Sequence, residues 1–174
     1  MTAKLKIRES ISADHEAIES LIPDAFPEEN LLPLVRDLLS DTAVTASLVC
    51  ETDSAIVGLV VFTKCSVSES PVNAALLGPL AVAPARQGQG IGSALVRAGL
   101  RRMKEMNVSL VCVLGDPAFY RRLGFLPESS VRPPFSLPAE YDGAWQSQVL
   151  GSHKEGFGTL SVPAQWRQPS LWIP

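Results

Sequence analysis

Residues that build metal centres and disulfide frameworks are scarce in this sequence, which has three cysteines and two histidines in 174 residues. Cys50, Cys65 and Cys112 are widely spaced among apolar neighbours and form no Cys-x-x-Cys pair. His15 and His153 stand far apart and have no cysteine or acidic partner at ligand spacing. The pattern predicts reduced core cysteines of a cytoplasmic protein and no metal site.

The sequence also lacks a run long enough to span a membrane, because its apolar stretches are broken within about ten residues. Residues 1–8 alternate lysine with apolar residues and lack the apolar segment of a signal peptide. A basic arm interleaved with aromatics is missing, which makes nucleic acid a poor candidate partner. Hydrophobic and charged residues, at 46% and 19%, lie in the ordinary globular range, so composition suggests neither disorder nor a fibrous repeat. A length of 174 residues suits one domain, and residues 1–174 are expected to form it.

Charge is unevenly distributed along the chain, although the formal net charge is only −3. Between Pro84 and Phe125, seven basic residues stand against two acidic ones, a net charge of +5, and the remainder carries −8. Such a segment is typical of a polyanion site, while solvated helix faces explain part of it. Eight acids between Asp14 and Asp41 either attract a cationic amine or, as the simpler interpretation, line solvated helices.

Hydrophobic periodicity predicts a mixture of strands and helices without an internal repeat. Ser12 is expected to cap a first helix, prolines at 23 and 27 to interrupt the chain before the next helix, and Gly78–Pro79 to interrupt a central strand. The expected strands are 4–9, 46–51, 55–67, 73–83, 109–114, 147–150 and 158–162; further helices are expected at 31–39, at 91–104 and between Asp116 and Gly124.

The most informative segment is the glycine-rich turn between the strand ending near Ala83 and the helix that follows. It reads Arg-Gln-Gly-Gln-Gly-Ile-Gly over residues 86–92. Glycines let a phosphate approach the backbone amides, and the helix dipole adds about half a positive charge, so pyrophosphate is the expected ligand. The spacing differs from the Gly-x-Gly-x-x-Gly of dinucleotide folds, and no lysine follows as in a Walker loop. A tight turn without a ligand is the alternative.

These residues resemble the central motif of the GNAT superfamily of N-acetyltransferases, and in particular its small bacterial members. Leu80, Val82 and Pro84 precede a Gln-x-x-Gly-x-Gly run at 87–92, and Tyr120 stands four residues before a Gly-Phe pair. The resemblance covers 77–125 and implies acetyl-CoA as acyl donor, without a metal. The implied cofactor-binding residues are Leu80, Ala81, Val82, Gln87, Gly88, Gln89, Gly90, Ile91, Gly92 and Ser93.

The resemblance also implies the fold. It is an α/β fold with a mixed, mostly antiparallel central sheet, a splay between the fourth and fifth strands, and helices on both faces. Those two strands end near Ala83 and Leu114. Residues 76–125 would form the cofactor-binding core, and 126–174 the C-terminal strands and tail. Because dimers are common among relatives, a homodimer is one assembly that the resemblance allows.

Tyr120 is the candidate catalytic residue. A phenol, with an ordinary pKa of about 10, is protonated at neutral pH and can donate a proton to the leaving CoA thiolate. Core packing is its alternative role. The base that deprotonates the acceptor amine is not identified by the sequence, and the candidates by residue type alone are Glu28, Glu29, Glu51, Asp116 and His153.

One position departs from the family pattern, and the role of the three tryptophans stays open. Val113 occupies the position where many relatives have an asparagine that contacts the cofactor, although a subset of small bacterial members shares the Leu-Gly-Asp-Pro turn at 114–117. Asp116 either replaces that polar group or, as the favoured interpretation, caps a helix. The tryptophans either shape an acceptor pocket or bury the C-terminal segment; they are Trp145, Trp166 and Trp172.

The sequence therefore predicts transfer of an acetyl group from acetyl-CoA to an acceptor, most simply a primary amine of a small molecule or peptide. The alternatives are a non-catalytic acyl-CoA-binding or regulatory module of the same fold and, more distantly, a dinucleotide oxidoreductase. Neither nucleic acid nor a membrane is an expected partner. The identity of the amine is open.

Overall fold

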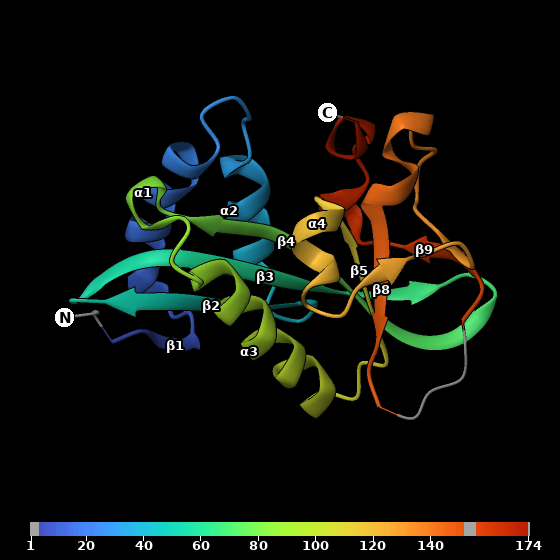
Figure 1. The fold of residues 1–174 in the computed structure, drawn as a ribbon, viewed down its shortest axis with the longest axis horizontal. Coiled ribbons are helices and arrows are strands. Elements are labelled where there is room, and N and C mark those ends of the chain that lie inside the picture. The colour runs from blue at the N-terminus through green and yellow to red at the C-terminus, as the bar shows by residue number, and fades with distance from the viewer. Residues whose placement is uncertain (1–3, 152–155, 174) are drawn as a thin grey trace. The chain divides into compact units, whose positions relative to one another are not determined.

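The computed structural model describes residues 4–151 and 156–173, and the chain forms two compact units (Figure 1). The first unit runs to Phe62 and includes Gly78–Gly99; the second contains Thr63–Leu77 and Leu100 onward. The expected single domain stays a prediction. His153 lies outside the described residues.

The first unit contains four strands in the order β1-β2-β3-β4, of which β3 and β4 continue into the second unit. Strand β1 is antiparallel to β2, with Lys6 opposite Glu51. Asp53 and Ser54 connect β2 to β3 with φ angles of 52° and 64°, as in a tight hairpin turn. The elements are β1 (Lys6–Glu9), α1 (His15–Ala25), α2 (Leu32–Ser40), β2 (Thr45–Thr52), β3 (Ala55–Val67), β4 (Ser70–Val82) and α3 (Ile91–Glu105), with short 3-10 turns at Ser12–Asp14 and Pro84–Arg86.

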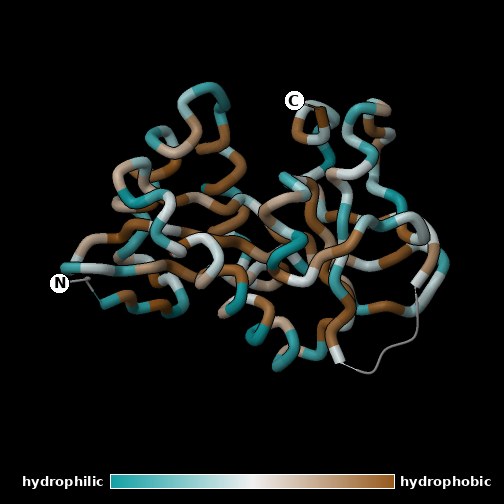
Figure 2. Tube along the Cα trace, in the orientation of Figure 1, coloured by the Kyte–Doolittle hydropathy of each residue, from teal (hydrophilic) through white to brown (hydrophobic). Residues whose placement is uncertain are grey.

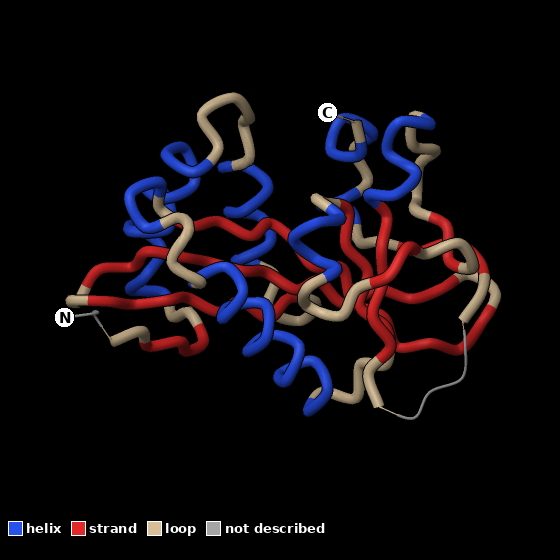
Figure 3. The backbone as a smooth tube through the Cα atoms, in the orientation of Figure 1, coloured by secondary structure: helices blue, strands red, loops and turns tan. Residues whose placement is uncertain are grey.

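Helices cover both faces of the first unit's strands, with α3 in front and α1 and α2 behind (Figures 1 and 3). Every residue of β3 from Val57 to Phe62 is buried, as expected of a strand covered on both faces. Figure 2 shows the hydrophobic colour along this strand and hydrophilic residues on the outer sides of the helices. The helices contribute buried stripes of Ile18, Leu21 and Ile22 and of Leu34, Val35 and Leu38.

Helix α3 packs very closely on β3, because glycine occupies the contact. A Cβ added to Gly99 would lie 2.1 Å from Cε2 of Phe62. We expect Gly99→Ala to lower the free energy of unfolding by about 2 kcal/mol, since the ring must leave its packed position. Urea denaturation followed by circular dichroism measures this change.

A matched control for this substitution is Gly143→Ala, because an added Cβ at Gly143 would meet nothing within 4 Å. Gly143→Ala should leave the urea midpoint unchanged, and the double substitution Gly99→Ala with Phe62→Leu should recover part of the loss. Equal midpoints for Gly99→Ala and the wild type would contradict close packing as the reason for this glycine.

In the second unit the continuations of β3 and β4 are followed by β5, β8 and β6, in the order β3-β4-β5-β8-β6, and β9 pairs with both β3 and β7. Strand β5 is parallel to β4 and antiparallel to β8, so the sheet is mixed. The elements are β5 (Leu110–Leu114), α4 (Pro117–Arg121), β6 (Leu126–Pro127), β7 (Val131–Arg132), β8 (Trp145–Val149) and β9 (Gly158–Ser161), with 3-10 segments at Ala139–Ala144, Ala164–Trp166 and Pro169–Trp172.

The fourth and fifth strands separate as predicted. Their parallel pairing runs from Ala74 and Leu110 to Leu76 and Cys112, while β4 continues to Val82. Beyond that register, β5 remains paired with β8 up to Leu114. The predicted α/β fold with a mixed, splayed sheet is therefore confirmed. The backbone is irregular at Gly78, whose φ of 147° favours glycine.

The three tryptophans bury the C-terminal segment within the second unit. The rings of Trp145 and Trp166 each meet Trp172 edge to face, at centroid distances of 5.8 and 6.0 Å. Each indole N–H donates a hydrogen bond: from Trp145 to the Val131 carbonyl, from Trp166 to the Thr63 hydroxyl, and from Trp172 to the Trp166 carbonyl. These contacts support the burial role that the sequence left open.

Two local predictions near the N-terminus differ from the structure. Helix α1 continues through Pro23 to Ala25, although proline has no N–H and so cannot donate to the carbonyl four residues earlier. Ser12 begins a 3-10 turn and supplies no side-chain cap. Instead, a carboxylate oxygen of Asp14 accepts a hydrogen bond from the Ile11 amide at 2.8 Å.

Candidate functional site

The glycine loop joins β4 to α3 in the first unit and has the conformation that its sequence predicts. Gly88 and Gly90 have φ angles of 77° and 83°, a region that side chains with a Cβ rarely adopt. The Gly90 carbonyl accepts a hydrogen bond from the Ala94 amide at 3.0 Å and so begins the helix. Gln87 folds back, and its side-chain amide donates to the Val82 carbonyl at 3.2 Å.

The space around this loop suits an anion that contacts the backbone. A Cβ added to Gly88 or Gly90 would meet nothing within 4 Å, so the glycines leave the amides open to approach. The 15-residue helix α3 begins directly after them and directs the positive end of its dipole to the loop. A diphosphate therefore fits this end of the first unit.

The structure places all ten predicted cofactor-binding residues in the first unit. Residues 87–90 are exposed, and Gly92 and Ser93 are half-buried. The side chain of Ile91 is 1% exposed, so only its backbone can meet a ligand. On β4, Ala81 points into the core, whereas Leu80 and Val82 are half-buried.

Tyr120 belongs to the second unit, on the short helix α4. Asp116 caps this helix, since its carboxylate accepts a hydrogen bond from the Ala118 amide at 3.0 Å, and Pro117 begins it. The Tyr120 ring is 7% exposed and meets Phe119 and Phe125 edge to face, at centroid distances of 4.9 and 5.5 Å. Burial, and to a lesser degree the negative charge of Asp116, raises the pKa of the phenol above its ordinary value.

The acids proposed as bases have differing environments. Asp116 is engaged as the cap of α4, which supports the favoured interpretation of that residue. Glu51 accepts a hydrogen bond from Arg8 Nε at 3.1 Å, and Glu28 and Glu29 are exposed. None of the four has a contact that marks it as the base.

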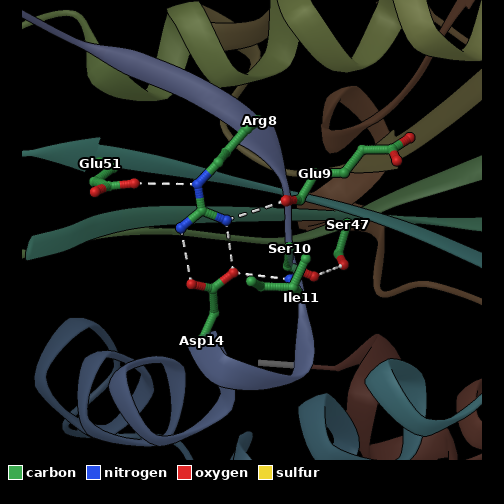
Figure 4. A network of polar contacts seen from close by, with 7 residues as sticks. All are labelled: Arg8, Glu9, Ser10, Ile11, Asp14, Ser47 and Glu51. Carbon is green, nitrogen blue, oxygen red and sulfur yellow. Dashed lines mark hydrogen bonds and ion pairs between the residues drawn. The ribbon is translucent and has the colours of Figure 1, made fainter. Parts of the chain in front are cut away.

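A charged network that the sequence did not reveal joins β1, the 3-10 turn at Ser12–Asp14 and β2 of the first unit (Figure 4). The guanidinium of Arg8 makes a bidentate contact with Asp14, at 2.8 and 2.9 Å, and also reaches Glu51. Asp14 is 6% exposed, and hydrogen bonding to Arg8 is the main reason that its pKa is lowered. The alternating pattern of residues 4–9 predicted the strand, but the partner of Arg8 could not be read from it.

A cavity of about 430 Å³ lies beside this network, between α1 and the β2–β3 turn. Its charged residues neutralise one another in part, and Glu19, elsewhere on α1, forms an ion pair with Arg36. Several of the N-terminal acids thus belong to structural ion pairs or to solvated helix faces. The cavity is bordered by Arg8, Asp14, Asp24, Glu51, Ile56 and Ala83.

Asp14→Asn tests the contribution of this network to stability. At pH 7 we expect the substitution to lower the free energy of unfolding by about 2 kcal/mol, because Arg8 loses its bidentate carboxylate partner and keeps only Glu51. The folded-state pKa of Asp14 lies below the unfolded value, so its contribution is present above about pH 4 and is lost as the pH falls further. Urea titrations at several pH values measure the difference between variant and wild type.

The exposed Asp24 on α1 offers the matched control, and Asp24→Asn should leave stability unchanged at each pH. A loss for Asp14→Asn that stays equal from pH 7 down to about pH 2 would contradict the ionised pair as its cause.

Cysteines and acids give no sign of a metal centre in the part of the chain that the structure describes. Residues 4–151 and 156–173 contain no group of three or more histidine, cysteine or acidic side chains able to hold an ion. Cys50, Cys65 and Cys112 are free and buried, and burial raises the pKa of the Cys65 thiol to about 12. No helix of this described part is long and apolar enough to cross a bilayer.

The profile of the Acetyltransferase (GNAT) family matches residues 11–125, a range that includes the glycine loop and Tyr120. The chain therefore belongs to the GNAT family, whose members are acyl-CoA-dependent N-acetyltransferases. This class of enzyme agrees with the splayed sheet and with the glycine-rich turn between β4 and α3.

Two relatives from Escherichia coli K12 support this assignment. The chain is 32% identical to the N-acetyltransferase YjhQ over 146 residues, covering 79% of this chain and 80% of YjhQ. It is 35% identical to the N-acetyltransferase YhbS over 120 residues, covering 68% of this chain and 72% of YhbS.

Solved structures extend the similarity over almost the whole chain. The crystal structure of E. coli YhbS in complex with CoA matches with a TM-score of 0.87 and 27% identity, covering 97% of this chain and 94% of YhbS. A GNAT acetyltransferase from Brucella melitensis in complex with acetyl-CoA matches with a TM-score of 0.77 and 27% identity, covering 95% and 99% of the two chains.

Proposed function

We propose that this protein transfers the acetyl group of acetyl-CoA to a primary amine by direct attack through a tetrahedral intermediate. The observation that carries the proposal is the loop at 87–92, in which Gly88 and Gly90 have positive φ angles and open the backbone to a diphosphate. The CoA and acetyl-CoA complexes of similar enzymes from E. coli and Brucella melitensis support the same donor.

The donor is held by backbone groups in this proposal. Amides of residues 87–93 bind the pyrophosphate, and the pantetheine arm pairs with β4 at Leu80, Ala81 and Val82 like an added strand. The end of the β4–β5 pairing at Leu76 leaves that part of β4 outside the parallel ladder. An amide of the same segment polarises the thioester carbonyl while its oxygen becomes an oxyanion.

Each proton and bond of the transfer has a destination. The neutral amine nitrogen attacks the carbonyl carbon and forms the new carbon–nitrogen bond, the carbon–sulfur bond breaks, and Tyr120 donates its phenolic proton to the departing thiolate. The nitrogen then releases its extra proton to solvent, and the Tyr120 phenolate takes a proton back from solvent, so the amide and the free thiol are the only products. An amine with an ordinary pKa of about 10.4 is almost fully protonated at pH 7, so a base or a chain of waters removes its proton before attack. The acceptor is a small-molecule or peptide amine.

Release of free thiol from acetyl-CoA tests the proposed reaction. The protein should bind CoA in a thermal-shift titration and release thiol with at least one amine from a panel of polyamines, amino sugars, aminoglycosides and lysine peptides. Binding of CoA without thiol release from any of them would favour a non-catalytic module. Binding of NADH in preference to CoA would favour a dinucleotide oxidoreductase.

The cellular setting is part of the same proposal. Three buried, unpaired cysteines suit the reducing conditions of the cytoplasm. Size-exclusion chromatography with light scattering distinguishes a monomer from the homodimer that is common among relatives.

A further inference from the structure

The turn between β5 and α4 lies in close contact with the ring of Tyr120. A Cβ added to Gly115 would lie 2.5 Å from Cε2 of Tyr120 and 3.2 Å from Cδ2. The aromatic ring therefore rests directly on the Gly115 backbone. Gly115 does not have a positive φ angle, so its backbone conformation is open to other residues. Glycine is required here because a Cβ would collide with the Tyr120 ring.

The Gly115 backbone is itself held by a buried side chain from β8. The Gln146 amide nitrogen donates to the Gly115 carbonyl at 3.2 Å and to the Ala144 carbonyl at 3.3 Å. The Gly115 amide in turn donates to the Ala144 carbonyl at 3.0 Å. Gln146 is 1% exposed, so its amide must satisfy its hydrogen bonds inside the protein, and this requirement fixes the turn.

The other sides of the Tyr120 ring are confined as well. Phe119 and Phe125 meet it edge to face, and the Phe125 amide donates to the Tyr120 carbonyl at 3.1 Å. The helix that carries the ring has only five residues and begins two positions after Gly115. A displacement of Gly115 therefore moves both the surface beneath the ring and the start of its helix.

We propose that Gly115 and Gln146 are positioning residues for Tyr120: Gly115 sets the place of the phenol ring, and Gln146 holds Gly115. The proposal rests on the proposed function, in which Tyr120 is the proton donor. Gly115 contacts the ring of Tyr120, and Gln146 contacts the carbonyl of Gly115. Both residues therefore act through Tyr120 in this proposal.

The first test combines Gly115→Ala with Tyr120→Phe in a double-mutant cycle, using acetyl-CoA and the best amine of the panel. Gly115→Ala should lower kcat about tenfold to thirtyfold and leave KM for acetyl-CoA nearly unchanged. In the Tyr120→Phe background the same substitution should change kcat less than about twofold, since the proton donor is already absent. If Gly115 has only a structural role, the substitution should lower kcat by the same factor in both backgrounds. That result would contradict the proposal.

A second variant keeps the test decisive if Gly115→Ala fails to fold. Gln146→Met preserves the side-chain length and removes both hydrogen bonds, and it should lower kcat with the same dependence on Tyr120. Gly143→Ala, in the same unit with open space around it, should leave kcat unchanged. If Tyr120→Phe lowers kcat but Gly115→Ala and Gln146→Met do not, this inference is wrong while the proposed function stands.

An optical readout reports the ring directly. The chain has two tyrosines, so in a Tyr141→Phe background alkaline ultraviolet titration follows Tyr120 alone. Gly115→Ala should move the ionisation of Tyr120 toward the ordinary pKa of about 10, because a displaced ring becomes more hydrated. An unchanged titration curve would mean that the ring keeps its place without Gly115. No loss of kcat with Tyr120→Phe would overturn its proposed acid role.

Discussion

Replacing Tyr120 with phenylalanine is expected to lower kcat about a hundredfold and to leave KM for acetyl-CoA within about threefold. The phenylalanine ring retains the edge contacts with Phe119 and Phe125, so the loss reports the hydroxyl group. Without a proton donor, CoA must leave as a bare thiolate. Steady-state kinetics over a range of acetyl-CoA and amine concentrations measure both constants.

The other tyrosine of the chain provides the matched control, and Tyr141→Phe should leave kcat unchanged. If Tyr120→Phe keeps full kcat while chemistry limits the rate, the acid role is wrong and Tyr120 is a packing residue.

The pH dependence of the wild-type enzyme follows from the same burial. The pKa of Tyr120 is raised, so the phenol stays protonated throughout the neutral and mildly alkaline range. The value of kcat/KM should therefore rise with pH toward about 10 as the acceptor amine loses its proton, without an early decline. A bell-shaped profile that falls near pH 8 and loses its descending limb in Tyr120→Phe would contradict the raised pKa.

Gly90→Ala is expected to weaken CoA binding about thirtyfold or more, which corresponds to roughly 2 kcal/mol. Alanine at a φ of 83° is strained, and its methyl group occupies the open space in which the proposed diphosphate meets the amides. Isothermal titration calorimetry with CoA measures the dissociation constant.

Gly151→Ala is the matched control for this substitution. Gly151 has a φ of 71° and open space around an added Cβ, but it lies outside the loop. Both variants should lose similar stability, and only Gly90→Ala should lose affinity for CoA. Undiminished affinity in Gly90→Ala would remove the loop as the pyrophosphate site.

The parts of the fold that the sequence predicted well depend on local chemistry. Gly88 and Gly90 adopt the backbone that a strand-to-helix anion loop needs, and Asp116 caps α4 where Pro117 begins it. Gly124 has the left-handed conformation expected of it, with a φ of 97°, although α4 already ends at Arg121. In each case the residue itself restricts the backbone, so neighbouring sequence is enough to foresee the result.

The features that the sequence did not reveal depend on partners far along the chain. Arg8 meets Glu51, 43 positions away, and the Trp166 indole meets Thr63, 103 positions away. Strands β6 and β7 have two residues each, too short for a periodic signal. Gln146 was also not singled out by any local pattern, because its proposed role depends on a hydrogen bond to Gly115, 31 positions away.

The placement of the indoles has an optical consequence. All three tryptophans belong to the second unit, and their exposed fractions are only 3%, 8% and 2%. Tryptophan fluorescence therefore follows the unfolding of that unit. The unit that carries the glycine loop has no tryptophan and does not contribute to this emission. A change in emission when CoA is added would thus be a signal from residues outside the loop's own unit.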